Sequence, residues 1–211
     1  MARKLFEKGG FVRGIAFFCF VLCSLVGSTR AESVNPHSTD LQANQSLLAS
    51  QCGYAIDKNL SAQILRSMSS VSDKVVSVYF YLKLTPVRRP IHGKLSFGCF
   101  SPQSEASQNN IPPKTTAKDE IALEDSGGRY ARNIVWQRTY DGEGWAGTIA
   151  YVNSVSGDEK KRRSPDFFLI CPNVDRLSCF SFEVEKLKLE NAESDRIPEL
   201  LRGVMLVNNN S

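Results

Sequence analysis

A strict alternation of apolar and polar side chains over residues 75–84 is the feature that most limits how this chain can fold. The apolar members of the alternation are Val76, Val78, Phe80, Leu82 and Leu84. The side chains between them are Ser77, Tyr79, Tyr81 and Lys83. Because successive side chains of a β-strand point to opposite faces, this pattern predicts a strand that buries one face and exposes the other.

A second strand is predicted at residues 94–100, where Leu95, Phe97 and Cys99 alternate with Lys94, Ser96 and Gly98. Pro86 and Pro90 mark a turn between the two segments. If the two strands pair, they form an antiparallel hairpin.

The second half of the chain predicts a series of further strands. They fall at residues 134–138, 145–152, 167–171 and 179–187. Residues 141–144, with the sequence Asp-Gly-Glu-Gly, predict a hairpin turn between the first two. A charged connection at residues 158–163 precedes the third. Since strands and helices do not alternate along the chain, a parallel sheet is not expected.

Two helices are predicted, one near each end of the folded part. Asp57 can cap a short helix in which Leu60, Ile64 and Met68 share a face. Asp195 can cap a C-terminal helix with Pro198 in its first turn. The buried stripe of this second helix is predicted to comprise Ile197, Leu200, Leu201 and Val204. The predicted fold class is therefore α+β: an antiparallel β-meander sheet with a helix near each end.

The first 31 residues have the organisation of a secretory signal peptide. Their basic n-region contains Arg3, Lys4, Lys8 and Arg13. The apolar run at residues 15–26 matches an h-region and is shorter than the roughly 20 residues needed to cross a bilayer. Small residues up to Ala31 suit cleavage, with an uncleaved N-terminal anchor as the alternative. No later stretch predicts a membrane span, so none is expected after cleavage.

Cleavage would change the charge of the chain. The whole sequence has 26 basic and 22 acidic residues, of which residues 1–31 contain five and one respectively. The mature chain would then carry 21 of each and have no net charge. A nucleic-acid partner, which a basic protein would suggest, is therefore not expected.

Cleavage would also leave four of the six cysteines. An even number of cysteines in an exported chain predicts disulfides rather than a metal site. Of the three pairings that four cysteines allow, we favour Cys171 with Cys179 and Cys52 with Cys99. The loops closed would contain about nine and about 48 residues, for which chain entropy gives roughly 2.6 and 4 kcal/mol.

The predicted domain organisation has three parts. Residues 1–31 are the signal peptide, and residues 32–50, rich in Ser, Asn, Gln and Thr, are a flexible leader. Residues 51–211 form a single α+β domain. Within it, residues 101–118 hold three prolines and no periodicity, which predicts an exposed loop.

Catalytic and metal-binding patterns are weak in this sequence. Of the two histidines, His37 lies in the predicted leader and His92 follows the turn at Pro90, so neither predicts a catalytic base. Two separated histidines do not supply a zinc site, and no nucleotide-binding glycine motif is present. No cofactor and no metal are predicted. A pair of carboxylates for hydrolysis remains an alternative, drawn from Glu120, Glu124, Asp141 and Glu143.

Several exposed features suggest a protein-binding surface. The basic run at residues 160–163 is predicted to lie at a solvated loop tip, although it could bind an acidic partner. Aromatic side chains supply much contact area at interfaces, with ordinary packing as the alternative. The candidate contact residues are Tyr79, Tyr81, Trp136, Arg138, Asp141, Glu143 and Trp145.

One short segment resembles a known family. Trp136-Gln137-Arg138-Thr139, followed by Gly142 and Gly144, is similar to a pattern in bacterial periplasmic immunity proteins of the type VI secretion lipase-effector class. In that family a Trp-Glu-Arg segment precedes a glycine-containing turn, and Gln137 departs from it. The likeness covers about 20 residues. It implies a non-catalytic exported protein that neutralises a secreted toxin by binding it.

The sequence therefore predicts a periplasmic or secreted protein that is not an enzyme and acts by binding another protein, with a toxin-neutralising immunity protein as the sharpest form. One alternative is an envelope hydrolase that uses carboxylates such as Glu120 and Glu143. Another is a structural or assembly factor of the envelope. A eukaryotic secreted protein is the third, because Asn44 and Asn59 begin formal glycosylation sequons.

Overall fold

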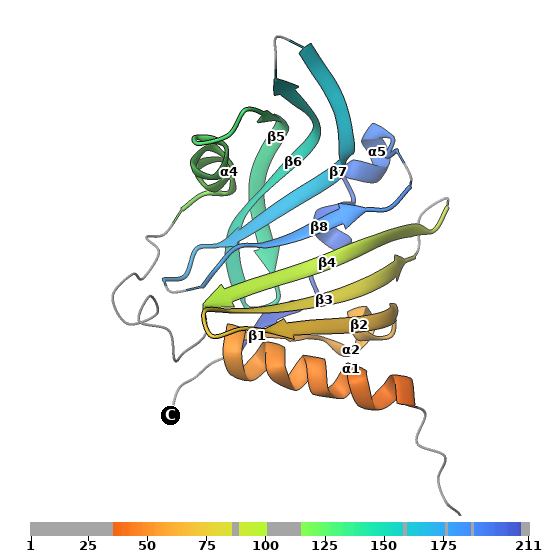
Figure 1. The fold of residues 1–211 in the computed structure, drawn as a ribbon. Coiled ribbons are helices and arrows are strands. Elements are labelled where there is room, and N and C mark those ends of the chain that lie inside the picture. The colour runs from red at the N-terminus through yellow and green to blue at the C-terminus, as the bar shows by residue number, and fades with distance from the viewer. Residues whose placement is uncertain are drawn as a thin grey trace, which may run out of the picture. The chain divides into compact units, whose positions relative to one another are not determined.

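Seven strands form one antiparallel sheet in the order β2-β3-β4-β8-β7-β6-β5 (Figure 1). The computed structural model describes residues 36–85, 89–100, 115–157, 160–175, 177–186 and 188–207. These residues belong to one unit, Val34–Ser211. The predicted signal peptide lies outside them. The predicted α+β class with an antiparallel sheet is confirmed.

The strands of this sheet are β2 (Ile64–Val71), β3 (Val75–Leu84), β4 (Ile91–Phe100), β5 (Ala131–Gly142), β6 (Trp145–Gly157), β7 (Lys160–Pro172) and β8 (Phe180–Val184). The predicted hairpin is β3–β4, which pairs along its full length from Val75 opposite Phe100 to Leu84 opposite Ile91. Strands β5 to β8 follow one another as the predicted meander, and β8 closes against β4 to join the two halves.

The turn between β5 and β6 lies where the sequence predicts it. Gly142 pairs with Trp145, which leaves Glu143 and Gly144 as the two turn residues. Gly144 has a φ of 80°, a left-handed conformation that glycine adopts without a steric penalty. The backbone conformation at position 144 therefore favours glycine over other residues.

One face of the sheet, called the inner face, carries the main hydrophobic core. It includes Val78, Phe80 and Leu82 from β3 and Phe180 and Phe182 from β8, all at most 1% exposed. Phe97 on β4 stacks on Phe180 with ring centroids 5.1 Å apart. The alternation in residues 75–84 thus buries the apolar side chains, as predicted.

Short elements cover the inner face. They are α1 (Pro36–Leu47), the π-helical turn η1 (Leu48–Cys52), α2 (Lys58–Ser61), α5 (Asn191–Ser194), α6 (Ile197–Leu200) and a two-stranded sheet of β1 (Tyr54–Ile56) and β9 (Val204–Leu206). Tyr54, Leu60 and Ile197 from these elements are buried in the same core. None of the helices within the described ranges combines the length and apolar composition needed to cross a membrane.

Both favoured disulfides are present. Cys52 of η1 is bonded to Cys99 of β4, across a sequence separation of 47 residues. Cys171 of β7 is bonded to Cys179, just before β8, across a separation of eight residues. The first bond fixes a covering element to the sheet, and the second closes the connection between two adjacent strands.

The prediction of a flexible leader at residues 32–50 is wrong for the part that the structure describes. Residues 36–47 form α1, because Leu41, Asn44 and Leu48 are spaced along one helical face that packs towards the core. Asn44 also donates from Nδ2 to the Ser67 hydroxyl at 2.9 Å. The polar composition of the segment concealed this face.

The helix predicted to extend from Asp57 to Met68 is also wrong. Asp57 caps α2 and accepts from the Leu60 amide at 2.7 Å, but α2 ends at Ser61 and Ile64 begins strand β2. A spacing of four residues fits one face of a helix and also one face of a regular strand, so the pattern does not separate the two. In β2 a bulge between Ile64 and Arg66 places Ile64 opposite buried Leu82 and Met68 opposite Tyr79 on the other face. Pairing with β3 decided between helix and strand, as tertiary context commonly does.

The prediction of one continuous C-terminal helix is also wrong, because the segment forms two short helices and a strand. Asp195 ends α5 instead of capping the next helix, and α6 is a single turn with Pro198 near its start. Val204 is buried as expected but lies on strand β9. Leu201 ends the helical turn and is fully buried. The apolar positions were identified correctly, whereas the element that holds them was not.

Two predicted loops contain regular secondary structure. The loop at 101–118 lies outside the described residues up to position 114, and Ala117 begins helix α4 (Ala117–Asp125), which the sequence did not predict. In the charged connection, Asp158 and Glu159 also lie outside the described residues. The basic residues 160–163 are not at a loop tip, because they form the first part of β7 and pair with β6.

Candidate interaction surface

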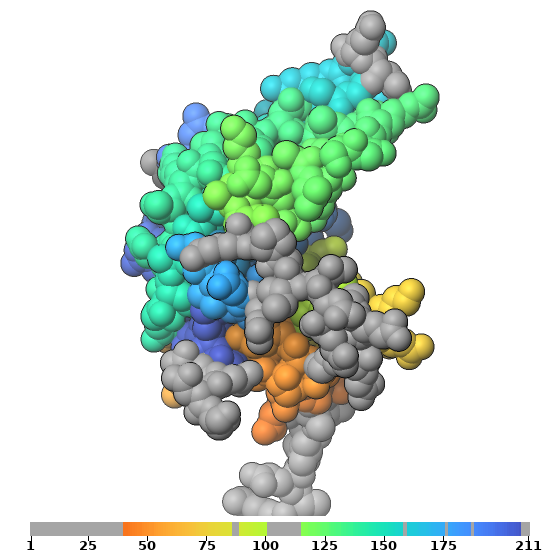
Figure 2. All heavy atoms as spheres, turned by 90° about the vertical axis from the view of Figure 1, so that its left-hand side faces the viewer, coloured from red at the N-terminus to blue at the C-terminus, as the bar shows by residue number. Residues whose placement is uncertain are grey.

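Among the described residues, a helix covers only part of the side of the sheet opposite the inner face. Helix α4 packs there against β5, β6 and β7, with Ala117 and Ile121 buried on Ala150, Val152 and Leu169. Figure 2 shows α4 in green on this part of the molecule. No described helix packs on the same side of β2, β3, β4 and β8, which we call the open outer face.

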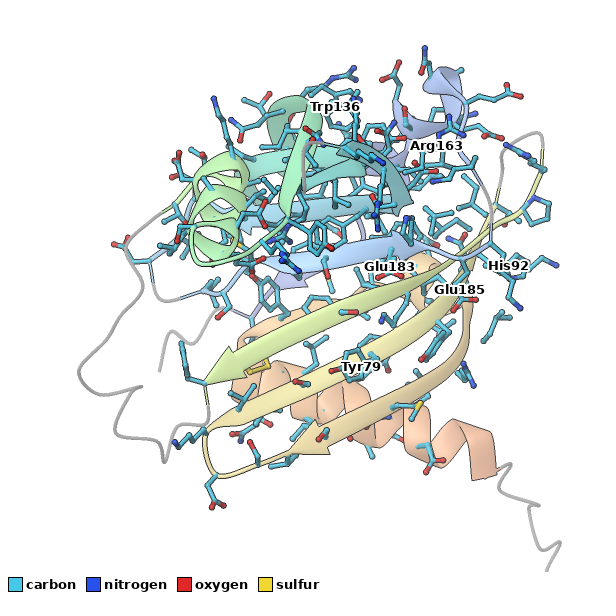
Figure 3. The ribbon with its side chains drawn as sticks, turned by 45° about the horizontal axis from the view of Figure 1, so that its top comes forward. Tyr79, His92, Trp136, Arg163, Glu183 and Glu185 are labelled. Atoms are coloured by element: carbon cyan, nitrogen blue, oxygen red, sulfur yellow. A yellow bond between two sulfur atoms is a disulfide. The ribbon has the colours of Figure 1, made fainter. Side chains whose placement is uncertain are left out.

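The polar side of the β3 alternation lies on the open outer face. Tyr79 and Tyr81 point there from between the buried residues of β3, and both are half-buried by their neighbours. Figure 3 shows Tyr79 on the exposed side of the strand. The sequence predicted this orientation correctly, because the alternation fixes it.

Strand register aligns charged residues with these tyrosines. Arg66 of β2 lies opposite Tyr81, Tyr81 lies opposite Lys94 of β4, and Lys94 lies opposite Glu183 of β8. We call these four residues the outer row. A basic, an aromatic, a second basic and an acidic side chain therefore lie side by side across four strands.

Two cation–π contacts hold side chains on this face. The Arg66 guanidinium carbon lies 3.8 Å from the centre of the Tyr81 ring, and Lys94 Nζ lies 5.8 Å from the centre of the Tyr79 ring. Such contacts contribute about 0.5–1 kcal/mol at exposed sites. They restrict long side chains that would otherwise sample many rotamers, so the face is partly organised before any partner arrives.

Apolar area extends this face towards the edge of the sheet. Met68 of β2 is 52% exposed and lies opposite Tyr79. Leu65 of the same strand is 51% exposed, whereas Val71 lies opposite buried Val76 and so belongs to the inner side of the sheet. Tyrosine and arginine are enriched at the energetic centres of protein interfaces, and exposed apolar side chains add area to bury.

The two tryptophans lie elsewhere. Trp136 of β5 packs against the inner core, with its ring centre 5.4 Å from that of Tyr151. Trp145 is only 8% exposed, and its indole N–H donates to the Val204 carbonyl at 2.8 Å. The packing alternative therefore holds for Trp145, which cannot contact a partner without leaving the core.

The remaining predicted contact residues are exposed but do not join the open outer face. Arg138 lies over Trp136 at 4.3 Å and pairs with Asp195 at 2.7 Å. Asp141 and Glu143 are exposed at the end of β5 and in the following turn. Since β3 and β5 are separated by four strands in the sheet, these residues and the two tyrosines form two separate regions.

The carboxylates of the hydrolase alternative are distributed over different places. Glu120 and Glu124 of α4 line a cavity of about 330 Å³ beside the Cys171–Cys179 disulfide. Asp141 lines a different cavity, and Glu143 lines neither. Glu124 is already paired with Arg132 at 2.5 Å. The specific pair Glu120 and Glu143 is therefore not brought together.

The histidines do not add a catalytic site. His92 is exposed on β4 opposite Lys83, and the side chain of His37 lies outside the described residues. In Figure 3, His92 lies at the periphery of the sheet, close to Glu185. Within the described ranges, no three or more His, Cys, Asp or Glu side chains form a group that could hold a metal ion.

Sequence reasoning missed two members of the outer row. Arg66 was assigned to a helix, and only its pairing with β3 places it beside Tyr81. Glu183 lies between Phe182 and Val184, so the alternation alone indicates that its side chain points outward. The alternation does not indicate that Lys94 is its neighbour on the next strand. Neighbours across a sheet depend on register, which no local pattern specifies here.

Comparison with known proteins gives no relative for this chain. No protein-family model matches it, and neither a curated protein nor a solved structure is significantly similar to it.

Proposed function

We propose that this protein acts outside the cytoplasm by binding another protein, and that it performs no catalysis. The observation that carries the proposal is the open outer face, where Tyr79, Tyr81 and Arg66 are presented on a sheet whose other face is packed. The two disulfides fit an oxidising compartment and hold the scaffold in one shape. A preformed surface loses little conformational entropy on binding.

The specific form we propose is a periplasmic immunity protein that neutralises a secreted toxin. Support comes from the predicted signal peptide and from the resemblance at residues 136–144. The region around Arg138, Asp141 and Glu143 is exposed and would form a second contact area, distinct from the open outer face. A toxin that engaged both would bury more of this protein than either region alone.

The test is affinity capture from envelope extracts of the source cell, with the oxidised protein as bait. The double variant Tyr79→Ser, Tyr81→Ser removes both rings from the open outer face without opening the core. We expect the wild-type protein to retain a partner and the variant to bind it at least about tenfold more weakly. Tyr130→Ser is the matched control, because Tyr130 is an exposed aromatic outside this face.

A second readout tests the immunity form. The captured partner, expressed with an export signal, should stop growth, and co-expression of this protein should restore it. Retention of the partner by the double variant would remove the open outer face as the binding site. A partner that is harmless in the envelope would contradict the immunity form while leaving protein binding intact.

A further inference from the structure

Strand β7 has 13 residues and pairs with β6 on one side, but its partner on the other side, β8, has only five. Residues 160–163 of β7 pair with β6 on one side, whereas β8 pairs with β7 only between Phe167 and Ile170. No described strand lies against the other side of residues 160–163. This stretch, which we call the free edge, therefore presents backbone N–H and C=O groups that the sheet does not use.

A groove runs beside the free edge where β7 and β8 diverge. Arg163, Ser164 and Pro165 form one wall, and residues 183–186 with Lys188 form the other, around a volume of about 660 Å³. Figure 3 shows Arg163 on one side of this region and Glu183 and Glu185 on the other. Pro165 has no backbone donor, which fits a strand edge without a partner.

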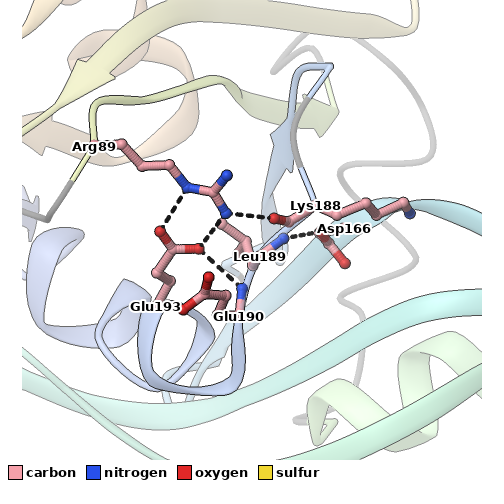
Figure 4. A network of polar contacts seen from close by, with 6 residues as sticks. All are labelled: Arg89, Asp166, Lys188, Leu189, Glu190 and Glu193. Carbon is pink, nitrogen blue, oxygen red and sulfur yellow. Dashed lines mark hydrogen bonds and ion pairs between the residues drawn. The ribbon is translucent and has the colours of Figure 1, made fainter.

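The wall opposite β7 is fixed in place by a polar network (Figure 4). The Leu189 amide donates to Asp166 Oδ2 at 2.8 Å, and Lys188 Nζ donates to the Ser164 carbonyl. Arg89 donates to the Lys188 carbonyl at 2.7 Å and to both oxygens of Glu193 at 2.8 Å. These bonds hold the segment at Lys188 and Leu189 against β7 at Ser164 and Asp166.

The free edge carries four consecutive cations. Lys160, Lys161, Arg162 and Arg163 are all exposed, and none forms an ion pair with another described residue. Because side chains alternate along a strand, two of them project on each face of the hairpin. The opposite wall adds Lys186 and Lys188 to Glu183 and Glu185, so it is close to neutral. The positive excess therefore belongs to the free edge.

We infer that the free edge of β7 binds an extended, acidic segment of the partner protein as an additional β-strand. The backbone groups of residues 160–163 supply strand pairing, and the four cations select carboxylates at neighbouring positions of the added segment. The groove receives the continuation of that segment past Arg163. This inference rests on the proposed protein-binding function and specifies the chemistry of the partner.

The test measures peptide binding to the purified, oxidised protein by fluorescence anisotropy. The probes are three ten-residue peptides that alternate Glu with Val, Lys with Val, and Glu with Pro. We expect the Glu-Val peptide to bind at least about tenfold more tightly than either other peptide, because only it combines acidic charge with strand-forming backbone. The variant Lys161→Ala, Arg163→Ala should weaken that binding about tenfold or more.

The matched control is Lys58→Ala, Lys74→Ala, which removes the same charge from exposed positions outside the groove. It should leave the affinity unchanged. Equal binding of the Glu-Val and Glu-Pro peptides would overturn strand addition. If the Lys161→Ala, Arg163→Ala variant kept its affinity for the peptide but self-associated, the proposal would be overturned. The cations would then serve only to prevent pairing between the free edges of two molecules. Preference for duplex DNA or anionic vesicles over the Glu-Val peptide would also overturn the proposal.

The outcome separates this inference from the proposed function. If the captured partner is lost with Tyr79→Ser, Tyr81→Ser but retained by Lys161→Ala, Arg163→Ala, protein binding stands and the free edge plays no part. If no partner is captured by the wild-type protein, the proposed function fails, whatever the peptide result.

Discussion

At the scale of single residues, a buried polar contact joins β6 and β7. The Tyr151 hydroxyl donates to Asp166 Oδ1 at 2.7 Å, and both residues are at most 4% exposed. The other carboxylate oxygen accepts from the Leu189 amide. Burial, together with the hydrogen bond to Asp166, raises the pKa of Tyr151 to about 12. The burial of Tyr151 should therefore make the stability of the protein depend on pH in the alkaline range.

Tyr151→Phe should lower the free energy of unfolding by about 1 kcal/mol at pH 7, because it removes one buried hydrogen bond. An unfolded tyrosine ionises near pH 10. The stability that neutral Tyr151 contributes is therefore complete below pH 10 and declines as the pH rises towards 12. The difference in free energy of unfolding between wild type and variant should therefore become smaller as the pH rises from 10 towards 12. Urea denaturation at several pH values measures it.

Tyr130→Phe, at an exposed position, is the control for this experiment and should change stability little at any pH. A gap between wild type and Tyr151→Phe that widens above pH 10 would contradict the assigned role of Tyr151. Tyr54 and Tyr140 also have raised pKa values because of burial, so alkaline unfolding of the whole protein should begin above pH 10.

At the scale of elements, α4 is defined by its N-terminal cap. The Thr116 hydroxyl accepts from the Asp119 amide at 3.3 Å, and the Asp119 carboxylate accepts from the Thr116 amide at 3.4 Å. This reciprocal capping box fixes where the helix begins. The Ala117 amide also donates to the Thr148 hydroxyl of β6 at 2.8 Å, which ties the helix start to the sheet.

Thr116→Ala should lower the free energy of unfolding by about 1 kcal/mol, because the cap loses its acceptor. Thr116→Ser keeps the hydroxyl and should retain most of the stability. Urea denaturation measures both variants, and amide exchange should be faster in α4 for the alanine variant alone. Equal stability of the two variants would show that the box does not stabilise the helix.

Elements were predicted well where the signal was alternation and poorly where it was spacing by three or four. Residues 75–84 have period two over ten positions, which no helix satisfies, and β3 has those bounds. Ile64 and Met68 fit either element, and the missed helix α4 has few apolar residues besides Ile121 and Leu123. Short helices in this protein depend on caps and contacts more than on composition.

At the scale of the whole molecule, the two disulfides differ in how much of the chain they restrain. Removing the Cys52–Cys99 bond with alanine at both positions should cost about 4 kcal/mol, and removing Cys171–Cys179 about 2.6 kcal/mol, by the loop-entropy relation. Urea denaturation of the two double variants measures this order. If removing the Cys171–Cys179 bond lowered the free energy of unfolding more than removing the Cys52–Cys99 bond, native contacts and not loop closure would determine how much each disulfide stabilises the protein.

Sequence alone determined the compartment prediction, the cysteine pairing we favoured and the buried side of the central strands. These derive from local patterns: a charged and apolar N-terminus, a cysteine count and a period of two. The pairing was then confirmed by the structure, whereas the compartment and the partner stay predictions.

Only the tertiary structure decided which of the predicted contact residues can meet a partner. It placed Trp145 in the core, separated Tyr81 from Asp141, and brought Arg66 beside Tyr81. It also turned the basic residues 160–163 from an expected loop into the free edge of a strand. Strand order and register set these positions, and both depend on contacts between residues far apart in the chain, which local periodicity does not encode.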